Sequence, residues 1–286
     1  MRNFDMGEAW LIMIAMLKEH GVAVTLVMLA TTVPFFALFY WLFSDFYLAA
    51  FENMNGDSQA MAGLMEGQSS LLGIVNIISW IASWTGCFIA WRLVLARGQD
   101  TTGGIIAYGF GAALMTTLAV ITIYILFFIA MLFVGMVVAL LAIGFASGGG
   151  VATAGTGPGL GPIFVLIYTG LLALMLFLLA RFGTTGPLMA AKRSYNSFQA
   201  LIDSWKLTKG NSLMLMLYLF IIGIAVALFM FALLVLAYFL TKISVALTLI
   251  VAVILYFSLI PLYLLVPAGI YRALADDSPA EAAASN

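Results

Sequence analysis

Eighty consecutive residues without a charged side chain, 101–180, limit what this chain can fold into. Asp100 precedes this stretch and Arg181 ends it. Over the full length of 286 residues only 8% are charged, whereas soluble domains carry about 25%. The chain therefore lacks the polar side chains needed to cover a water-soluble globule. Because a lipid environment requires every backbone group to be paired within the protein, we predict an all-α integral membrane protein.

The number of membrane spans follows from the length of the apolar segments. One membrane-crossing helix needs about 20 predominantly apolar residues, so the uncharged stretch holds two. A glycine-rich run at 148–161, in which 7 of the 14 residues are glycine, separates them, and we expect it to lie outside the bilayer. Six spans are predicted in total, at 21–43, 71–94, 115–143, 163–181, 212–240 and 243–271.

The basic residues predict the orientation. With six spans, ten of the eleven basic residues fall on the same side as both termini, and only Lys242 falls on the other side. Cytoplasmic loops of membrane proteins carry an excess of lysine and arginine, so we expect both termini in the cytoplasm. The ten residues are Arg2, Lys18, Arg92, Arg97, Arg181, Lys192, Arg193, Lys206, Lys209 and Arg272.

One connection has the pattern of an amphipathic helix. In 196–211, Phe198, Leu201, Ile202 and Trp205 recur at helical spacing, while polar side chains occupy the other face. Asn196 with Gln199 three residues later predicts the helix start, and Gly210 its end. A helix this short does not span a bilayer, and such helices lie in the headgroup plane with the apolar face down.

Similar amphipathic helix patterns follow Asp5 and, more weakly, Asp100. The three candidate capping residues, Asp5, Asp100 and Asn196, are 95 and 96 residues apart, and Arg92, Arg181 and Arg272 are 89 and 91 apart. This spacing predicts three units, 1–98, 99–193 and 194–274, each a surface helix followed by a helical hairpin. The alternative is that any six-span chain with even loops shows such spacing. Together the units form one membrane domain, 1–274, followed by a flexible cytoplasmic tail, 275–286.

The segment from Arg181 to Asn211 carries a resemblance. It reads RFGTTGPLMAAKRSYNSFQALIDSWKLTKGN. An arginine, a proline-bearing stretch and a helix ending in SWKLTKGN resemble the membrane domain of glycerophosphoryl diester phosphodiesterases and related bacterial six-span inner-membrane proteins. The resemblance implies a location in the bacterial inner membrane. The signature positions that it implies are Ser204, Trp205, Leu207, Thr208, Gly210 and Asn211.

Catalytic chemistry is not indicated. We expect no room in the chain for the soluble barrel that carries catalysis in those two-domain enzymes, and His20 is its only histidine. The chain has no HExxH or GxSxG motif and no paired acids on a helix face. We therefore expect neither an enzyme nor a bound metal or other cofactor. A net charge of −1 argues against a nucleic-acid partner.

The remaining hypothesis places function on the cytoplasmic face. We predict that the chain interacts with or organises membrane phospholipids, and that a protein partner or a second copy of the chain is compatible with this role. The alternatives are that the basic residues only determine topology, and that the chain is a transporter or channel for a lipid or small apolar solute. The candidate headgroup-binding residues are Arg92, Arg97, Arg181, Lys192, Arg193, Lys206 and Lys209.

Overall fold

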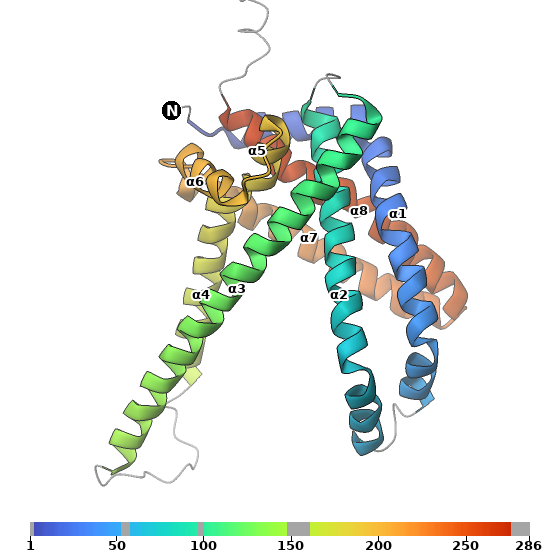
Figure 1. Ribbon diagram of the computed structural model, residues 1–286, viewed down its shortest axis with the longest axis vertical. Helices are drawn as coiled ribbons and strands as arrows, with labels where there is room; N and C mark the ends of the chain where they lie inside the picture. Colours follow the sequence, from blue (N-terminus) through green and yellow to red (C-terminus); the bar gives the residue numbers. More distant parts are fainter. Residues whose placement is uncertain (1–2, 53–57, 97–99, 148–160, 276–286) are drawn as a thin grey trace, which may run out of the picture.

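The computed structural model describes residues 3–52, 58–96, 100–147 and 161–275, which form helices and no strand (Figure 1). Arg2, Arg97, the run 148–160 and the tail from 276 onward lie outside the described residues. The helices of the described residues are α1 Met6–Glu52, α2 Ser58–Leu95, α3 Thr102–Ser147, α4 Gly161–Phe182, α5 Thr185–Lys192, α6 Ser197–Leu207, α7 Ser212–Thr241 and α8 Val245–Leu274.

The chain is a multi-pass membrane protein. Within the described residues, five helical segments are long and apolar enough to cross a bilayer, on α1, α2, α3, α4 with α5, and α7. The described side chains of α8 contribute a shorter apolar segment, Leu259–Leu274. The all-α membrane class is confirmed, whereas six spans and the threefold repeat stay predictions.

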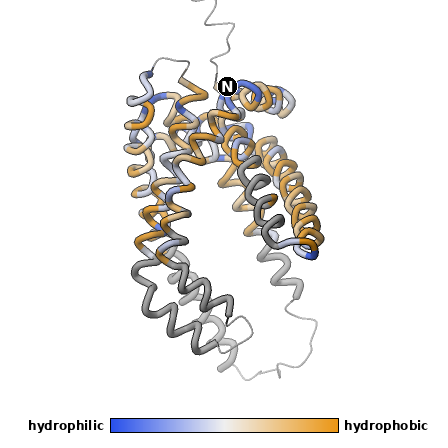
Figure 2. Tube along the Cα trace, turned by 90° about the vertical axis from the view of Figure 1, so that its right-hand side faces the viewer, coloured by the Kyte–Doolittle hydropathy of each residue, from blue (hydrophilic) through white to orange (hydrophobic). Residues whose placement is uncertain are grey.

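Two of the predicted surface helices are not separate elements. α1 contains 47 residues and α3 contains 46, so each continues from its polar start directly into the apolar segment. The first part of α1 runs across one end of the molecule before the helix turns along α2 (Figures 1 and 2). The Thr25 hydroxyl donates to the carbonyl of Gly21 at 2.8 Å, a contact that often bends helices. The predicted break at Gly21 is therefore a bend within one helix.

The starts of these two helices differ in how well they were predicted. Asp5 accepts hydrogen bonds from the backbone of Gly7 at 2.7 Å and Glu8 at 3.1 Å, as expected for a capping residue. At α3 the cap is Thr101, whose hydroxyl accepts from the Gly104 backbone at 3.2 Å. The prediction that Asp100 caps this helix is wrong, because its carboxylate binds two arginines instead.

The second half of the chain is closer to the prediction. α4 and α7 begin and end within two residues of the predicted spans 163–181 and 212–240. The predicted turn near Lys242 is confirmed, with the Ile243 and Ser244 backbones donating to the carbonyl of Leu240. α8 continues through Pro261 and Pro267. In the first half, by contrast, α2 begins at Ser58, well before the predicted span 71–94.

Among the side chains that the structure describes, the buried core lies at one end of the molecule. We call it the charged end, because the last turns of α2, α4, α5, α6 and α8 there carry Arg92, Arg181, Lys192, Lys206 and Arg272. α2 packs against α1 and α3, α1 against α8, and α5 against α2 and α6. Away from this end, α3 and α4 diverge from α1 and α2 (Figure 1).

The helices beyond the core expose large apolar side chains. On α7 the only buried residues are Leu215 and Tyr218, both near its start at the charged end. Figure 2 shows the hydrophobic colouring continuing along the helices, with polar residues gathered at the charged end. This distribution is the one expected where lipid tails, rather than water, surround the exposed helix faces.

Candidate functional site

The predicted amphipathic helix is present as α6. The Asn196 side chain accepts from the Gln199 backbone at 2.9 Å, which confirms the predicted start. Gly210, after the helix end, has φ +87°, a left-handed conformation that favours glycine. The Gln199 side chain does not complete a capping box, because its amide donates to Asp203 at 2.9 Å.

The orientation of α6 is unusual for a helix packed on a protein core. It buries a face of small residues, Ser197, Ala200 and Ser204, against the rest of the chain. Three of its large apolar side chains remain exposed. We call them the apolar ridge, and they are Phe198, Ile202 and Trp205. Exposed apolar area next to charged residues is typical of an interaction surface.

Buried hydroxyls hold α6 on the end of α4. Ser204 Oγ donates its one proton to the carbonyl of Arg181 at 2.7 Å. The Thr184 hydroxyl, whose oxygen is 2.7 Å from Ser204 Oγ, is therefore the donor of the bond between these two side chains. Thr208 Oγ1 bonds the Ser204 carbonyl at 2.9 Å within the same buried group. Asn211 accepts from the backbone of Phe4 at 2.9 Å, which ties the chain start to α7. The signature residues Ser204, Thr208 and Asn211 therefore make hydrogen bonds within the chain.

Ser204→Ala is expected to lower the free energy of unfolding by about 1–3 kcal/mol, because it leaves the Arg181 carbonyl and the Thr184 hydroxyl buried with one partner fewer. The measurement is unfolding in a titration of sodium dodecyl sulfate into dodecyl maltoside micelles. Ile202→Ala, on the exposed face of the same helix, is the control and should change stability by less than about 0.5 kcal/mol. Equal losses in both variants would contradict the assignment.

Three of the predicted basic residues bind helix ends instead of standing free. Arg181 Nη1 donates to the carbonyl of Trp205 at 3.3 Å, near the C-terminus of α6, and its guanidinium lies 4.6 Å from the Trp205 ring centroid. Arg92 Nη1 donates to the carbonyls of Ala190 at 2.7 Å and Ala191 at 3.1 Å, at the C-terminus of α5. Arg272 Nη2 donates to Val94 near the end of α2. Each compensates the partial negative charge of a helix C-terminus.

Arg92 also belongs to a buried ion cluster. Its Nε donates to Asp100, and the two side chains are only 7% and 8% exposed. Arg193 lies at the surface, and its Nη1 is 3.2 Å from the other carboxylate oxygen of Asp100. The hydrogen bond from Arg92, with the charges of both arginines, holds the pKa of Asp100 below its ordinary value. The buried guanidinium of Arg92 is thus used within the protein.

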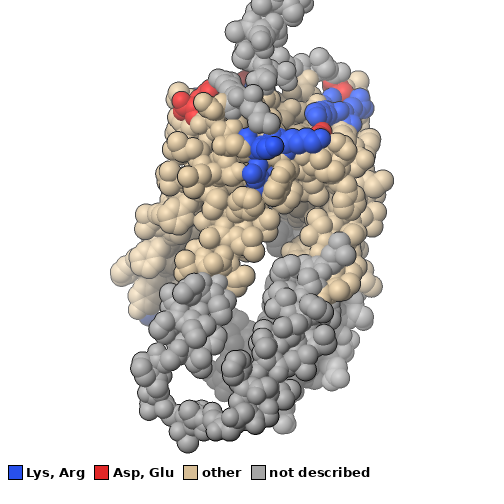
Figure 3. Space-filling model, turned by 90° about the vertical axis from the view of Figure 1, so that its left-hand side faces the viewer, with Lys and Arg blue, Asp and Glu red and all other residues tan. Residues whose placement is uncertain are grey.

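The other candidate headgroup residues stay at the surface. Lys192, Arg193, Lys206 and Lys209 are exposed, and Arg181 is half-buried. Basic side chains gather in a band near the charged end, above an uncharged surface (Figure 3). The structure thus separates buried Arg92 from a set of accessible cations around α5 and α6.

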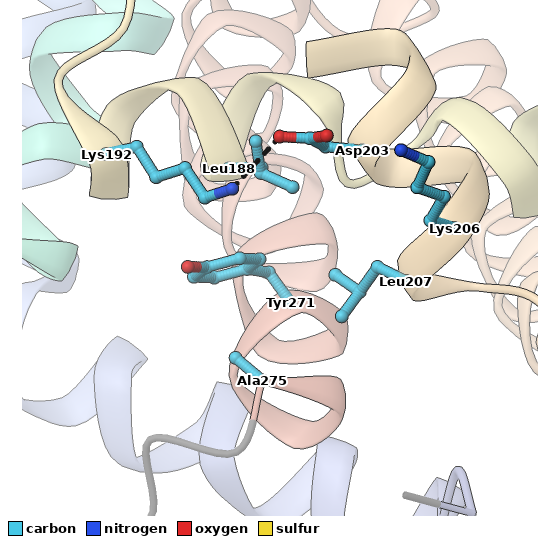
Figure 4. Close-up of a pocket in the computed structure, with 7 residues that line it drawn as sticks. All are labelled: Leu188, Lys192, Asp203, Lys206, Leu207, Tyr271 and Ala275. Carbon is cyan, nitrogen blue, oxygen red and sulfur yellow. Dashed lines mark hydrogen bonds and ion pairs between the residues drawn. The ribbon is translucent and has the colours of Figure 1, made fainter. Parts of the chain in front are cut away.

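A pocket of about 410 Å³ lies between α5, α6 and the end of α8 (Figure 4). Lys192 and Lys206 reach it from opposite sides, with Asp203 between them and the ring of Tyr271 below. We call it the lysine pocket, and its lining is Leu188, Lys192, Asp203, Lys206, Leu207, Tyr271 and Ala275.

Asp203 is the charged centre of the lysine pocket. Lys192 Nζ donates to one carboxylate oxygen at 3.0 Å, and Gln199 donates to the other. These two hydrogen bonds, together with the positive charges of Lys192 and Lys206, hold the pKa of Asp203 below its ordinary value. The carboxylate is therefore ionised near neutral pH, and the pocket carries two ammonium groups against one carboxylate.

The sequence does not indicate the site role of several residues of this region. It predicts Asp100 as a helix cap, and it predicts no site role for Thr184, Asp203 and Tyr271. For Asp203 a signal existed, since Gln199 and Asp203 are four residues apart on one helix face. Tyr271 lies on α8, far from α5 and α6 in the sequence, and only the fold shows its proximity.

Among the described residues, no group of three or more His, Cys, Asp or Glu side chains is placed to hold a metal ion. The chain matches no known protein-family model, and comparisons with curated proteins and with solved structures find no match. The chemistry of the charged end is therefore the basis for a functional conclusion.

Proposed function

We propose that this chain is a non-catalytic, six-span protein of a bacterial inner membrane that binds anionic phospholipid with its charged end, and that both termini face the cytoplasm. The observation that carries the proposal is the orientation of α6, with the apolar ridge exposed beside Lys206 and Lys209. Such a helix buries its ridge among acyl chains while its cations meet headgroups.

The position of α6 supports contact with lipid. The ring of Trp205, at the end of the apolar ridge, packs against Phe177 and Phe182 of α4, with centroids 5.8 and 5.5 Å away. α4 supplies part of a membrane-crossing segment, so the ridge continues the apolar surface of that segment. Tryptophan is enriched at this interfacial depth, because its ring is apolar and its N–H is polar.

The resemblance to the phosphodiesterase membrane domain fits this proposal but carries no activity with it. The alternative, a transporter or channel, predicts a cavity between the helical hairpins. The lysine pocket lies at the charged end, between two short helices and the end of α8, where its ammonium groups can meet a lipid headgroup.

Quenching of Trp205 fluorescence by brominated lipid tests the proposal. In proteoliposomes, the Trp205 signal is the difference between wild type and Trp205→Phe. We expect brominated phosphatidylglycerol to quench it more strongly than brominated phosphatidylcholine. Lys209→Gln should reduce the preference about fivefold, because one lysine near an anionic surface contributes about 1 kcal/mol.

The control is Lys242→Gln, which removes the same charge at the α7–α8 turn and should leave the preference unchanged. If both brominated lipids quench Trp205 equally, the charged end does not select anionic lipid and the proposal is wrong. If neither quenches it, the apolar ridge does not contact acyl chains.

A further inference from the structure

We infer that the lysine pocket binds one phosphate group, as the headgroup phosphate of a lipid or as a free phosphate compound. This inference deepens the proposed function and rests on it, because it assigns a discrete ligand to the surface that contacts lipid. It concerns Lys192, Lys206 and Asp203, and not the apolar ridge, so the two proposals can fail separately.

Helix dipoles contribute to the charge of the lysine pocket. The pocket lies beside the C-terminal ends of α5, α6 and α8, which carry partial negative charge and on their own favour cations. Arg92 donates to the last carbonyls of α5, and Arg181 donates to the Trp205 carbonyl of α6. Because these arginines already compensate two of the helix ends, Lys192 and Lys206 are not needed for that purpose.

The charged side chains of the lysine pocket do not cancel. Asp203 neutralises one of the two lysines, so the three side chains leave one positive charge in the pocket. That charge complements a phosphodiester, which carries one negative charge, and ammonium groups bind phosphate as strong hydrogen-bond donors. Lys192 is 54% exposed, so its bond to Asp203 can be exchanged for a bond to a phosphate oxygen.

The lysine pocket has an apolar lining beside its charged groups. Leu188 and Leu207 flank the charged groups, and the Tyr271 ring lies beneath them (Figure 4). An apolar lining beside two ammonium groups suits a phosphate ester whose carbon chain leaves along the protein surface. The volume of about 410 Å³ accommodates a headgroup and not a whole lipid, so acyl chains must remain outside.

The negative charge of Asp203 predicts opposite effects on phosphate binding for the Asp203 and lysine variants. A phosphate must compete with this carboxylate for Lys192 and is repelled by it. Asp203→Asn should therefore strengthen phosphate binding, whereas loss of the lysines should weaken it. A variant that merely misfolds loses binding and does not gain it, so the two opposite effects separate a ligand site from a structural role.

The experiment has a lipid arm and a free-phosphate arm, both on the full chain in dodecyl maltoside, which contains no phosphorus. In the lipid arm, native mass spectrometry follows the first adduct during titration with phosphatidylglycerol. We expect the dissociation constant to rise at least about tenfold in Lys192→Gln/Lys206→Gln and to fall about threefold in Asp203→Asn. Lys18→Gln, exposed on α1 and outside the pocket lining, is the charge-matched control and should not change it.

In the free-phosphate arm, phosphorus NMR line broadening reports binding of inorganic phosphate to the same four proteins. If only phosphatidylglycerol shows the opposite effects of the lysine and Asp203 variants, the ligand is a lipid headgroup. If inorganic phosphate alone shows them, the pocket serves a free phosphate compound. If neither probe distinguishes the pocket variants from Lys18→Gln, the inference is overturned, even where Trp205 still prefers anionic lipid.

Discussion

Arg92→Met is expected to lower the free energy of unfolding by about 1–3 kcal/mol, because the carbonyls at the end of α5 lose a buried donor and Asp100 loses one of its two arginines. The substitution keeps an unbranched apolar stem and removes every donor. It takes from Asp100 its buried partner and from Ala190 and Ala191 the guanidinium that caps α5. The measurement is the dodecyl sulfate unfolding titration.

Arg193→Gln is the matched control for Arg92→Met. Arg193 binds the same carboxylate, but its side chain is 52% exposed, and exposed ion pairs contribute about 0–1 kcal/mol. Adding Asp100→Asn to Arg92→Met should recover part of the loss, because the buried charge disappears with its partner. If Arg92→Met and Arg193→Gln cost the same, Arg92 is a surface topology residue and the buried cluster contributes nothing particular.

The same pair gives unfolding a pH dependence. Arg92 and Arg193 hold the pKa of Asp100 below its unfolded value, so the stabilisation is fully present above about pH 4. It is lost as the pH falls through the lowered pKa, since protons then bind the unfolded chain more tightly than the folded one. Asp100→Asn should therefore flatten the acid limb of a plot of stability against pH.

Local signals in the sequence were enough for part of this architecture. The capping residue Asn196, the left-handed Gly210 and the helical spacing of the apolar ridge all lie within the single segment 196–211, and α6 forms as predicted. The ends of α4 and the start of α7 were also predictable, because glycine and polar residues interrupt long apolar runs there. Such signals need no knowledge of distant contacts.

The joining of helices in the first half was less predictable. Gly21 and the glycines of α3 indicate breaks when judged by helix propensity alone. In the fold two glycines of α3 allow close packing, because a Cβ added to Gly109 would overlap the side chain of Ile89 on α2 and one added to Gly111 would overlap the ring of Tyr195. A tertiary contact thus accounts for a glycine that local propensity interprets as a helix end.

The candidate site was predictable as a set of charges but not as geometry. The positive-inside pattern identified Arg92, Arg181 and Lys192 together, yet only the fold distinguishes a buried capping arginine from an exposed lysine. Arg92 meets a carbonyl 98 residues away in the sequence, and the lysine pocket joins α5 and α6 to the end of α8. No spacing rule links residues at such separations.

The contact between α5 and α2 is the basis of the second large prediction. Gly186 lies against the ring of Trp91, and a Cβ built on it would lie less than 3.0 Å from three ring atoms. The ring cannot easily yield, because its indole N–H donates to the Leu264 carbonyl at 2.9 Å and it packs edge-on against Phe88. A side chain at position 186 must therefore displace α5 from α2.

Gly186→Ala is expected to lower the free energy of unfolding by about 1–3 kcal/mol through overpacking, and Gly186→Leu by more. Gly223→Ala on α7 is the matched control, because nothing lies within 4 Å of the added Cβ. That control should be neutral or stabilising by up to about 1 kcal/mol, since alanine favours helix over glycine. If Gly186→Ala lowers the free energy of unfolding and Gly223→Ala raises it, the constraint lies in the contact between α5 and α2. A stabilised Gly186→Ala protein would show instead that α5 does not pack on Trp91, and the position of Lys192 over the lysine pocket would then lose its support.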